Sequence, residues 1–152
     1  MPLPNIFTKE VSDKIIQRIN NLSSETPPLW GKMNASQMLA HCTVVYEMVY
    51  ETKHKKPNAF MSFILKLIVK DKIVGEKPYS HNLRTAPQFI MTDSKNFDTE
   101  KKRLIDFINK TQELGEGHFE NKENLSFGNL NKTEWNNMFY KHLDHHLSQF
   151  GV

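Results

Sequence analysis

Apolar residues recur at helical spacing in five separate segments of the chain. In the first segment the apolar positions lie three or four residues apart on one helix face: Val11, Ile15, Ile16, Ile19 and Leu22. Thr8 precedes this run and is a suitable N-cap, and the helix is expected to stop before Pro27 and Pro28. A second helix is predicted from its cap, Asn34, to about Thr52.

Two further segments predict one short helix and one long helix. Residues 59–70 form the short helix, which is apolar on nearly all sides, as is typical of a buried helix. The next helix is predicted to begin at its cap, Asp98, and to close at Gly115 and Gly117, because glycine favours the end of a helix. Together with the first two, these segments favour an all-α protein.

The last helix is predicted from its cap, Thr133, to about Phe150. Residues 71–96 show no sustained period, and a connection of this length in a compact protein is either a crossover or a functional loop. The chain has no internal repeat and no low-complexity tract. We therefore expect residues 1–152 to form a single domain, a helical bundle with one long crossover loop.

Composition narrows the classes of protein to which this chain can belong. Its one cysteine, Cys42, can form neither an internal disulfide nor a CxxC motif, which favours a reducing compartment. The net charge of +3 comes from scattered lysines without a nucleic-acid-binding motif, so we expect no nucleic acid as partner. No signal-peptide pattern opens the chain, and Lys66 interrupts its longest apolar run. A cytoplasmic protein without a membrane partner is the expectation.

The last predicted helix carries a pair of histidines with metal-ligand spacing. His142 and His146 are four residues apart and project from one helix face, ~40° apart around the axis. They lie within or beside the apolar side of this helix, whereas His145 lies on its polar flank. Imidazoles that face a core need partners, and a metal ion is one. The alternative is a pair of histidines that bond backbone carbonyls or water.

A third histidine strengthens the metal interpretation. His41 lies in the middle of the second helix among Met38, Val45 and Met48, where solvated residues are not expected. Three neutral imidazoles from two helices would make an open site with one position left for water or substrate. Imidazole suits zinc or nickel. Cys42 follows directly but points ~100° away, which favours a buried thiol over a Cys–His catalytic pair.

Two blocks of sequence resemble a known family. Residues 28–41 read PLWGKMNASQMLAH, and KTEW at 132–135 is followed by YKHLDHHLSQFG at 140–151. Both resemble the DUF1569 family, part of the DinB/YfiT-like superfamily. The resemblance implies an up-down-down-up four-helix bundle, here with an extra short helix and the long crossover loop. It also implies a metal held by His41, His142 and His146.

One position departs from the family pattern. Relatives often carry His-Pro directly before the Phe-Gly of the final loop, where this chain has Leu125 and Ser126 before Phe127 and Gly128. If that histidine contacts a substrate in relatives, the contact is missing here.

The leading functional hypothesis is a divalent-metal-dependent enzyme. An ion held by three neutral ligands keeps its full charge and can activate water or a thiol. Resemblance to a superfamily with thiol-dependent transferases and isomerases implies S-transfer with a low-molecular-weight thiol, and hydrolysis is the other reaction considered. Three residues are candidates for binding a small-molecule substrate: His81, Arg84 and His145. Lys77 or Lys141 could also hold the carboxylate of an acidic thiol.

Other interpretations stay open at this point. A non-catalytic, stress-related protein could bind a metal or ligand that mainly braces the bundle. A peripheral membrane protein could use helix 59–70 with its lysines, but we rank this last because an all-round apolar helix is usually buried. Tyr46 and Glu47 are alternatives for orienting His41. A homodimer formed through an exposed apolar face is a further expectation.

Overall fold

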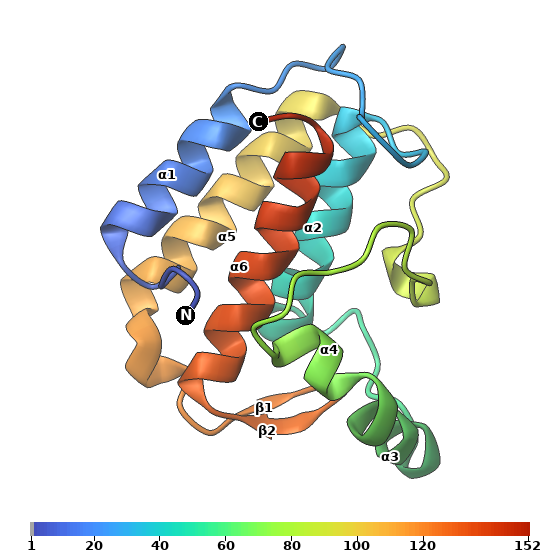
Figure 1. Ribbon diagram of the computed structural model, residues 1–152, viewed down its shortest axis with the longest axis vertical. Helices are drawn as coiled ribbons and strands as arrows, with labels where there is room; N and C mark the ends of the chain where they lie inside the picture. Colours follow the sequence, from blue (N-terminus) through green and yellow to red (C-terminus); the bar gives the residue numbers. More distant parts are fainter. Residues whose placement is uncertain (1) are drawn as a thin grey trace.

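The computed structural model describes residues 2–152, and the chain in it is mostly helical (Figure 1). Its helices are α1 (Lys9–Asn20), α2 (Ala35–Tyr50), α3 (Ala59–Ile68), α4 (Lys70–Val74), α5 (Phe97–His118) and α6 (Lys132–Gln149), with a 3-10 turn at Pro87–Phe89. The four longest helices, α1, α2, α5 and α6, pack together around a common core. The short helices α3 and α4 lie near the beginning of α6.

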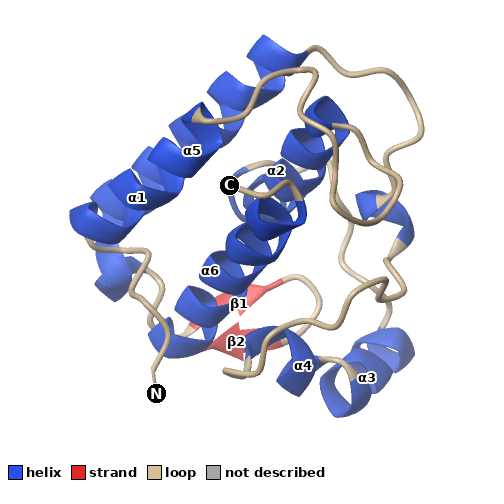
Figure 2. Cartoon of the chain, turned by 45° about the horizontal axis from the view of Figure 1, so that its top comes forward, coloured by secondary structure: helices blue, strands red, loops and turns tan. Residues whose placement is uncertain are grey.

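A small hairpin that the sequence did not predict lies between α5 and α6 (Figure 2). Its strands, β1 (Lys122–Asn124) and β2 (Gly128–Leu130), pair antiparallel with Glu123 opposite Asn129. Strands of three residues are too short to show the alternation by which a strand is recognised in a sequence.

The first two predicted helix starts are confirmed. The Thr8 hydroxyl accepts the backbone N–H of Val11 at the start of α1. Asn34 forms a capping box with Gln37 at the start of α2, in which each side chain accepts the backbone N–H of the other residue. Both helices therefore begin where a side-chain acceptor satisfies free N–H groups of the first turn.

The other two predicted caps are wrong by two residues each. At α6, Asn131 rather than Thr133 is the cap, because Asn131 and Glu134 form a reciprocal capping box. At α5, the Asn96 side chain accepts from the backbone N–H of Thr99, so the helix begins ahead of Asp98. Gly115, where the sequence predicted the end of this helix, is a kink with a φ of +72°, and helical residues continue to His118.

Aromatic stacking joins α2 to α6 in the core. The ring of Tyr46 on α2 stacks on Phe139 of α6 with centroids 4.8 Å apart, and Phe139 stacks on Trp135 at 5.4 Å. All three side chains are almost fully buried. This packing holds the two helices that carry the predicted metal ligands beside each other.

The predicted short helix differs most from expectation. It is divided at Val69 into α3 and α4, and none of the ten described residues of α3 is buried. The prediction of a buried helix is therefore wrong, because α3 packs mainly on α4 and not within the core. Within residues 2–152, no helix combines the length and the apolar character that crossing a bilayer requires.

Side-chain bonds from α6 reach the second of these two short helices. The Lys141 ammonium donates to the carbonyl oxygens of Lys72 and Gly75 at 2.9 and 2.6 Å. Asn137 donates to the carbonyl of Val74 at 2.9 Å. These bonds fix the end of α4 against α6.

A buried carboxylate ties α2 to α5 and to the segment that follows α2. Glu47 is 4% exposed, and its oxygens lie 2.8 Å from both Arg103 and His54 and 2.5 Å from Lys53. Burial alone would raise the pKa of Glu47, but the hydrogen bonds with Lys53, His54 and Arg103 outweigh it and hold the pKa below its ordinary value. The ionised carboxylate therefore stabilises the fold.

Replacing this carboxylate should destabilise the protein. We expect Glu47→Gln to lower the free energy of unfolding at pH 7 by about 2 kcal/mol, because cationic partners lose their counter-charge. Since the folded pKa is depressed, the contribution is present at neutral pH and is lost as the pH falls below about 4.3. Urea unfolding at several pH values measures this. Glu51→Gln, at a half-exposed neighbour that pairs only at 3.7–3.8 Å, is the control and should change little. Equal losses in the two variants would contradict the assignment.

Candidate metal centre

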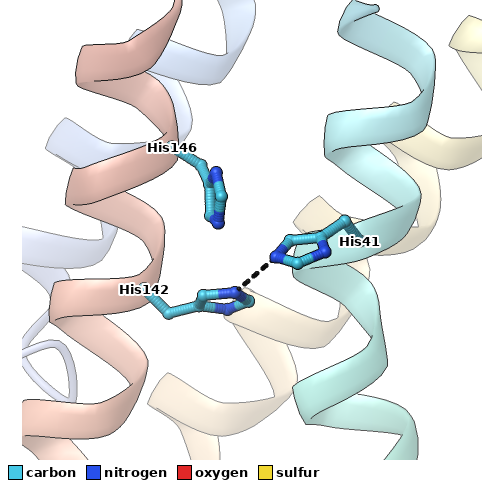
Figure 3. Close-up of side chains that lie close together, drawn as sticks. All are labelled: His41, His142 and His146. Carbon is cyan, nitrogen blue, oxygen red and sulfur yellow. Dashed lines mark hydrogen bonds between the residues drawn. The ribbon is translucent and has the colours of Figure 1, made fainter. Parts of the chain in front are cut away.

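The structure brings the three predicted metal ligands together between α2 and α6 (Figure 3). His41 projects from α2, and His142 and His146 project from α6 one turn apart. Their ligand nitrogens all lie within 4.8 Å of one another. The three side chains are only 6%, 9% and 9% exposed. This cluster, the histidine triad, has the donor set that can hold a metal ion.

Hydrogen bonds fix the tautomer of two members of the histidine triad. Nδ1 of His41 lies 2.8 Å from the carbonyl oxygen of Phe89, and Nδ1 of His146 lies 2.8 Å from Oε1 of Gln149. Because these oxygens only accept, each Nδ1 must donate, and each Nε2 keeps a free lone pair. The Gln149 amide is itself oriented, because its Nε2 donates to the carbonyl of Trp30 at 2.7 Å.

The third histidine completes the fit to a metal ion. Nε2 of His142 lies 3.0 Å from Nε2 of His41. Because His41 Nε2 carries only a lone pair, His142 Nε2 donates the proton in this bond. A tetrahedral ion with bonds of about 2.0–2.1 Å holds neighbouring nitrogens roughly 3.3 Å apart. Admitting an ion therefore needs a small displacement of these rings and a move of the His142 proton from Nε2 to Nδ1, so that Nε2 of His142 also offers a lone pair.

Burial keeps the histidine triad neutral. Desolvation lowers the pKa of His142 well below its ordinary value, and the neighbouring histidines lower it further. Desolvation also lowers the pKa of His146 to about 3, and the nearby His41 acts in the same direction. The pKa of His41 is lowered by burial, partly offset by the hydrogen bond to Phe89. Neutral imidazole is the form that binds metals.

Two of the predicted substrate-binding residues lie together beside the histidine triad. The ring of His145 lies 4.9 Å from that of His146, and His81 stacks on Trp30 with centroids 3.9 Å apart. His145 contacts both His81 and Trp30 edge-on. These three side chains line one cavity of about 200 Å³. Arg84 is exposed and is not part of the lining.

The same cavity contains a buried lysine. Lys141 is 5% exposed, and burial lowers its pKa to about 8. Its ammonium lies over the ring of Tyr79, 4.5 Å from the centroid, and also forms the two bonds to the end of α4. Of the basic residues proposed to hold a carboxylate, Lys141 lines the cavity, whereas Lys77 does not.

Comparison with known families places the chain. Residues 7–151 match a family described as "Protein of unknown function (DUF1569)". The chain belongs to the DUF1569 family. The match includes both sequence blocks and all three members of the histidine triad, so the predicted family is confirmed. No curated protein and no solved structure matches this DUF1569 chain.

The residues that orient the triad in this DUF1569 protein were not predicted. Glu47 bonds Lys53, His54 and Arg103, so the proposal that it orients His41 is wrong; the Phe89 carbonyl bonds His41 instead. A loop carbonyl leaves no trace in a sequence. Gln149 could have been found, because it follows His146 by three residues and so lies one turn further along α6.

The bond from Gln149 also restricts the loop between α1 and α2. Gly31 has a φ of +82°, and a Cβ atom there would lie 2.4 Å from Nε2 of Gln149. Glycine at this position therefore lets the loop backbone approach the amide that orients His146.

These bonds predict the ionisation and tautomer of His146. In metal-free protein, its ring should be neutral with the proton on Nδ1 and should not titrate between about pH 7 and pH 5, where a free histidine does. Nitrogen NMR of the ring measures both properties. Gln149→Leu should abolish the Nδ1–H preference, because the accepting oxygen is lost, whereas Ser148→Ala at the exposed neighbouring position should not. An Nε2–H tautomer in the wild type, or titration in this range, would contradict the assignment.

Proposed function

We propose that this DUF1569 protein binds one divalent metal ion, zinc or nickel, through His41, His142 and His146. The supporting observation is that three buried, neutral imidazoles converge, with Nδ1 of His41 and of His146 engaged by oxygen atoms. A hydrogen bond to the ring nitrogen that does not bind the metal orients metal-binding histidines in proteins generally. Imidazole donors without carboxylates favour borderline ions over magnesium or calcium.

We also propose the finer fold assignment that the resemblance implies. An up-down-down-up four-helix bundle of the DinB/YfiT-like superfamily agrees with the packing of α1, α2, α5 and α6 around one core. Facing helices of such bundles are a usual place for metal sites. Cytoplasmic location, a homodimer and the absence of a nucleic-acid partner stay predictions.

The proposed activity is S-transfer with a low-molecular-weight thiol. An ion bound by three neutral ligands retains its charge and lowers the pKa of a thiol or water at its open position. The three residues of the histidine triad include no carboxylate, whereas Glu76 and Asp144 line the adjoining cavity. An ion that lowers the pKa of its bound thiol or water can form the thiolate or the hydroxide without a protein base. Thiol chemistry is proposed ahead of hydrolysis because the resemblance implies a superfamily with thiol-dependent transferases and isomerases.

The cavity beside the triad supplies a place for the rest of the substrate. His145 contacts His146 and also lines the cavity, so the two regions adjoin. Lys141 would bind a carboxylate of the thiol, because its buried ammonium has no carboxylate within 4.0 Å among the described residues. His81 and Trp30 form one wall. A small acidic thiol is the substrate class proposed.

A non-catalytic role is the second candidate. The histidine triad is at most 9% exposed, which agrees with an ion that mainly braces α2 against α6. A stress-related metal- or ligand-binding protein would need no general base, and the triad cluster contains no carboxylate. Loss of folding stability on metal removal, without any thiol effect, would favour this candidate.

Metal content tests the proposed ligands directly. Purified protein should carry close to one equivalent of zinc or nickel by elemental analysis. His142→Ala and His146→Ala should each lose most of it, because two imidazoles hold such an ion far more weakly than three. His118→Ala, at a histidine outside the triad on α5, is the matched control and should retain the metal. Full retention in a His41→Ala/His142→Ala double variant would refute the site.

Cobalt substitution tests the thiol chemistry. Thioglycolate and mercaptoethanol should both change the visible spectrum of the cobalt protein, and His142→Ala should abolish thiol conjugation of an electrophile. Lys141→Met should weaken the thioglycolate effect roughly tenfold, because a charged hydrogen bond is lost, and should leave mercaptoethanol unaffected. If neither thiol changes a spectrum that azide or cyanide does change, S-transfer is the wrong reaction.

A further inference from the structure

The exposed side of α3 is an apolar surface without a partner among the described residues. Five large side chains form it, and their exposed fractions run from 47% to 74%: Phe60, Met61, Phe63, Leu67 and Ile68. Phe60, Phe63 and Leu67 are spaced three and four residues apart, so they share one helix face. We name these five residues the α3 apolar surface. Contiguous exposed apolar patches of this kind mark interaction sites in soluble proteins.

The α3 apolar surface is held in place by the rest of the protein. Asn58 caps the helix by accepting the backbone N–H of Met61 at 2.8 Å. Leu65, on the opposite side of α3, packs against the core. Behind α3, α4 is fixed to α6 by Lys141, Asn137 and the ion pair between Lys70 and Glu134. The N-cap of α3, the packing of Leu65 and the fixed position of α4 therefore hold these apolar side chains outward.

Lysines are frequent in and beside the segment that carries this surface. Residues 53–72 contain six lysines and one acidic residue, Asp71. Lys53, Lys56 and Lys70 pair with glutamates elsewhere in the fold. The other three, Lys55, Lys66 and Lys72, are exposed, and no ion pair joins them to another described residue. Lys66 lies within α3, one turn from Phe63, and its ammonium lies close to Gly128 of the hairpin.

We propose that α3 docks this protein on an anionic lipid surface. The apolar side chains would lie at the boundary between headgroups and acyl chains, with the three unpaired lysines against the lipid phosphates. A second copy of the chain is less suited to this surface, because pairing would bring the same positive charges towards each other. The exposure of α3 also removes the objection that an all-round apolar helix is usually buried. This inference does not depend on metal binding.

Vesicle flotation with the full-length protein tests the proposal. Wild type should float with mixed phosphatidylcholine–phosphatidylserine vesicles and not with pure phosphatidylcholine vesicles, and added salt should weaken its binding. Phe63→Ser/Leu67→Ser and Lys66→Glu/Lys72→Glu should each lower the partition coefficient about tenfold or more. All four side chains are exposed, so circular dichroism and thermal unfolding should stay as in the wild type.

Matched controls separate α3 from the general surface. Leu114→Ser changes an exposed leucine on α5, and Lys32→Glu changes an exposed lysine in the loop before α2. Both should leave flotation unchanged. The proposal is wrong if wild type binds no vesicles, if it binds neutral vesicles equally, or if the controls lose as much binding as the α3 variants. A dimer by light scattering that Phe63→Ser/Leu67→Ser dissociates, without vesicle binding, would assign the surface to a second copy instead.

Discussion

The structure depends on placing three neutral imidazoles in the desolvated contact between α2 and α6. Burial favours the uncharged ring, but each ring still has two nitrogens that need partners. Segments that are distant in the sequence supply some of these partners: Phe89 bonds His41, and the Trp30 carbonyl orients the amide that bonds His146. The long segment between α4 and α5 and the loop before α2 are thus fixed by the chemistry of the histidines they approach.

Two buried charged side chains elsewhere in the molecule, Glu47 and Lys141, differ in the partners that compensate their desolvation. Glu47 stays ionised because its ion pairs with Lys53 and Arg103 and its hydrogen bond with His54 compensate its desolvation. Among the residues that the structure describes, Lys141 contacts carbonyl oxygens and an aromatic ring and forms no ion pair, and burial lowers its pKa to about 8. A carboxylate ligand in the adjoining cavity would restore the missing counter-charge. Glu47 therefore belongs to a structural ion pair, whereas Lys141 is suited to binding a ligand.

The sequence predicted the parts of this protein that repeat or have a fixed spacing. Helical periodicity located the main helices, and the four-residue separation of His142 and His146 placed both rings on one face. Prediction from the sequence failed where the partners of a side chain come from distant parts of the chain. The Phe89 carbonyl has no sequence signal, and an apolar helix such as α3 looks buried until its neighbours are known. The caps of α5 and α6 were misplaced because several capping residues stand close together.

The close approach of Gly31 to Gln149 has a consequence for variation within the DUF1569 family. The two residues are far apart in the sequence but compete for one volume, since a methyl group on the first would overlap the amide of the second. Relatives that carry a larger residue at the first position should therefore carry a shorter side chain at the second. Such covariation would show in which members of the family the support of His146 is kept.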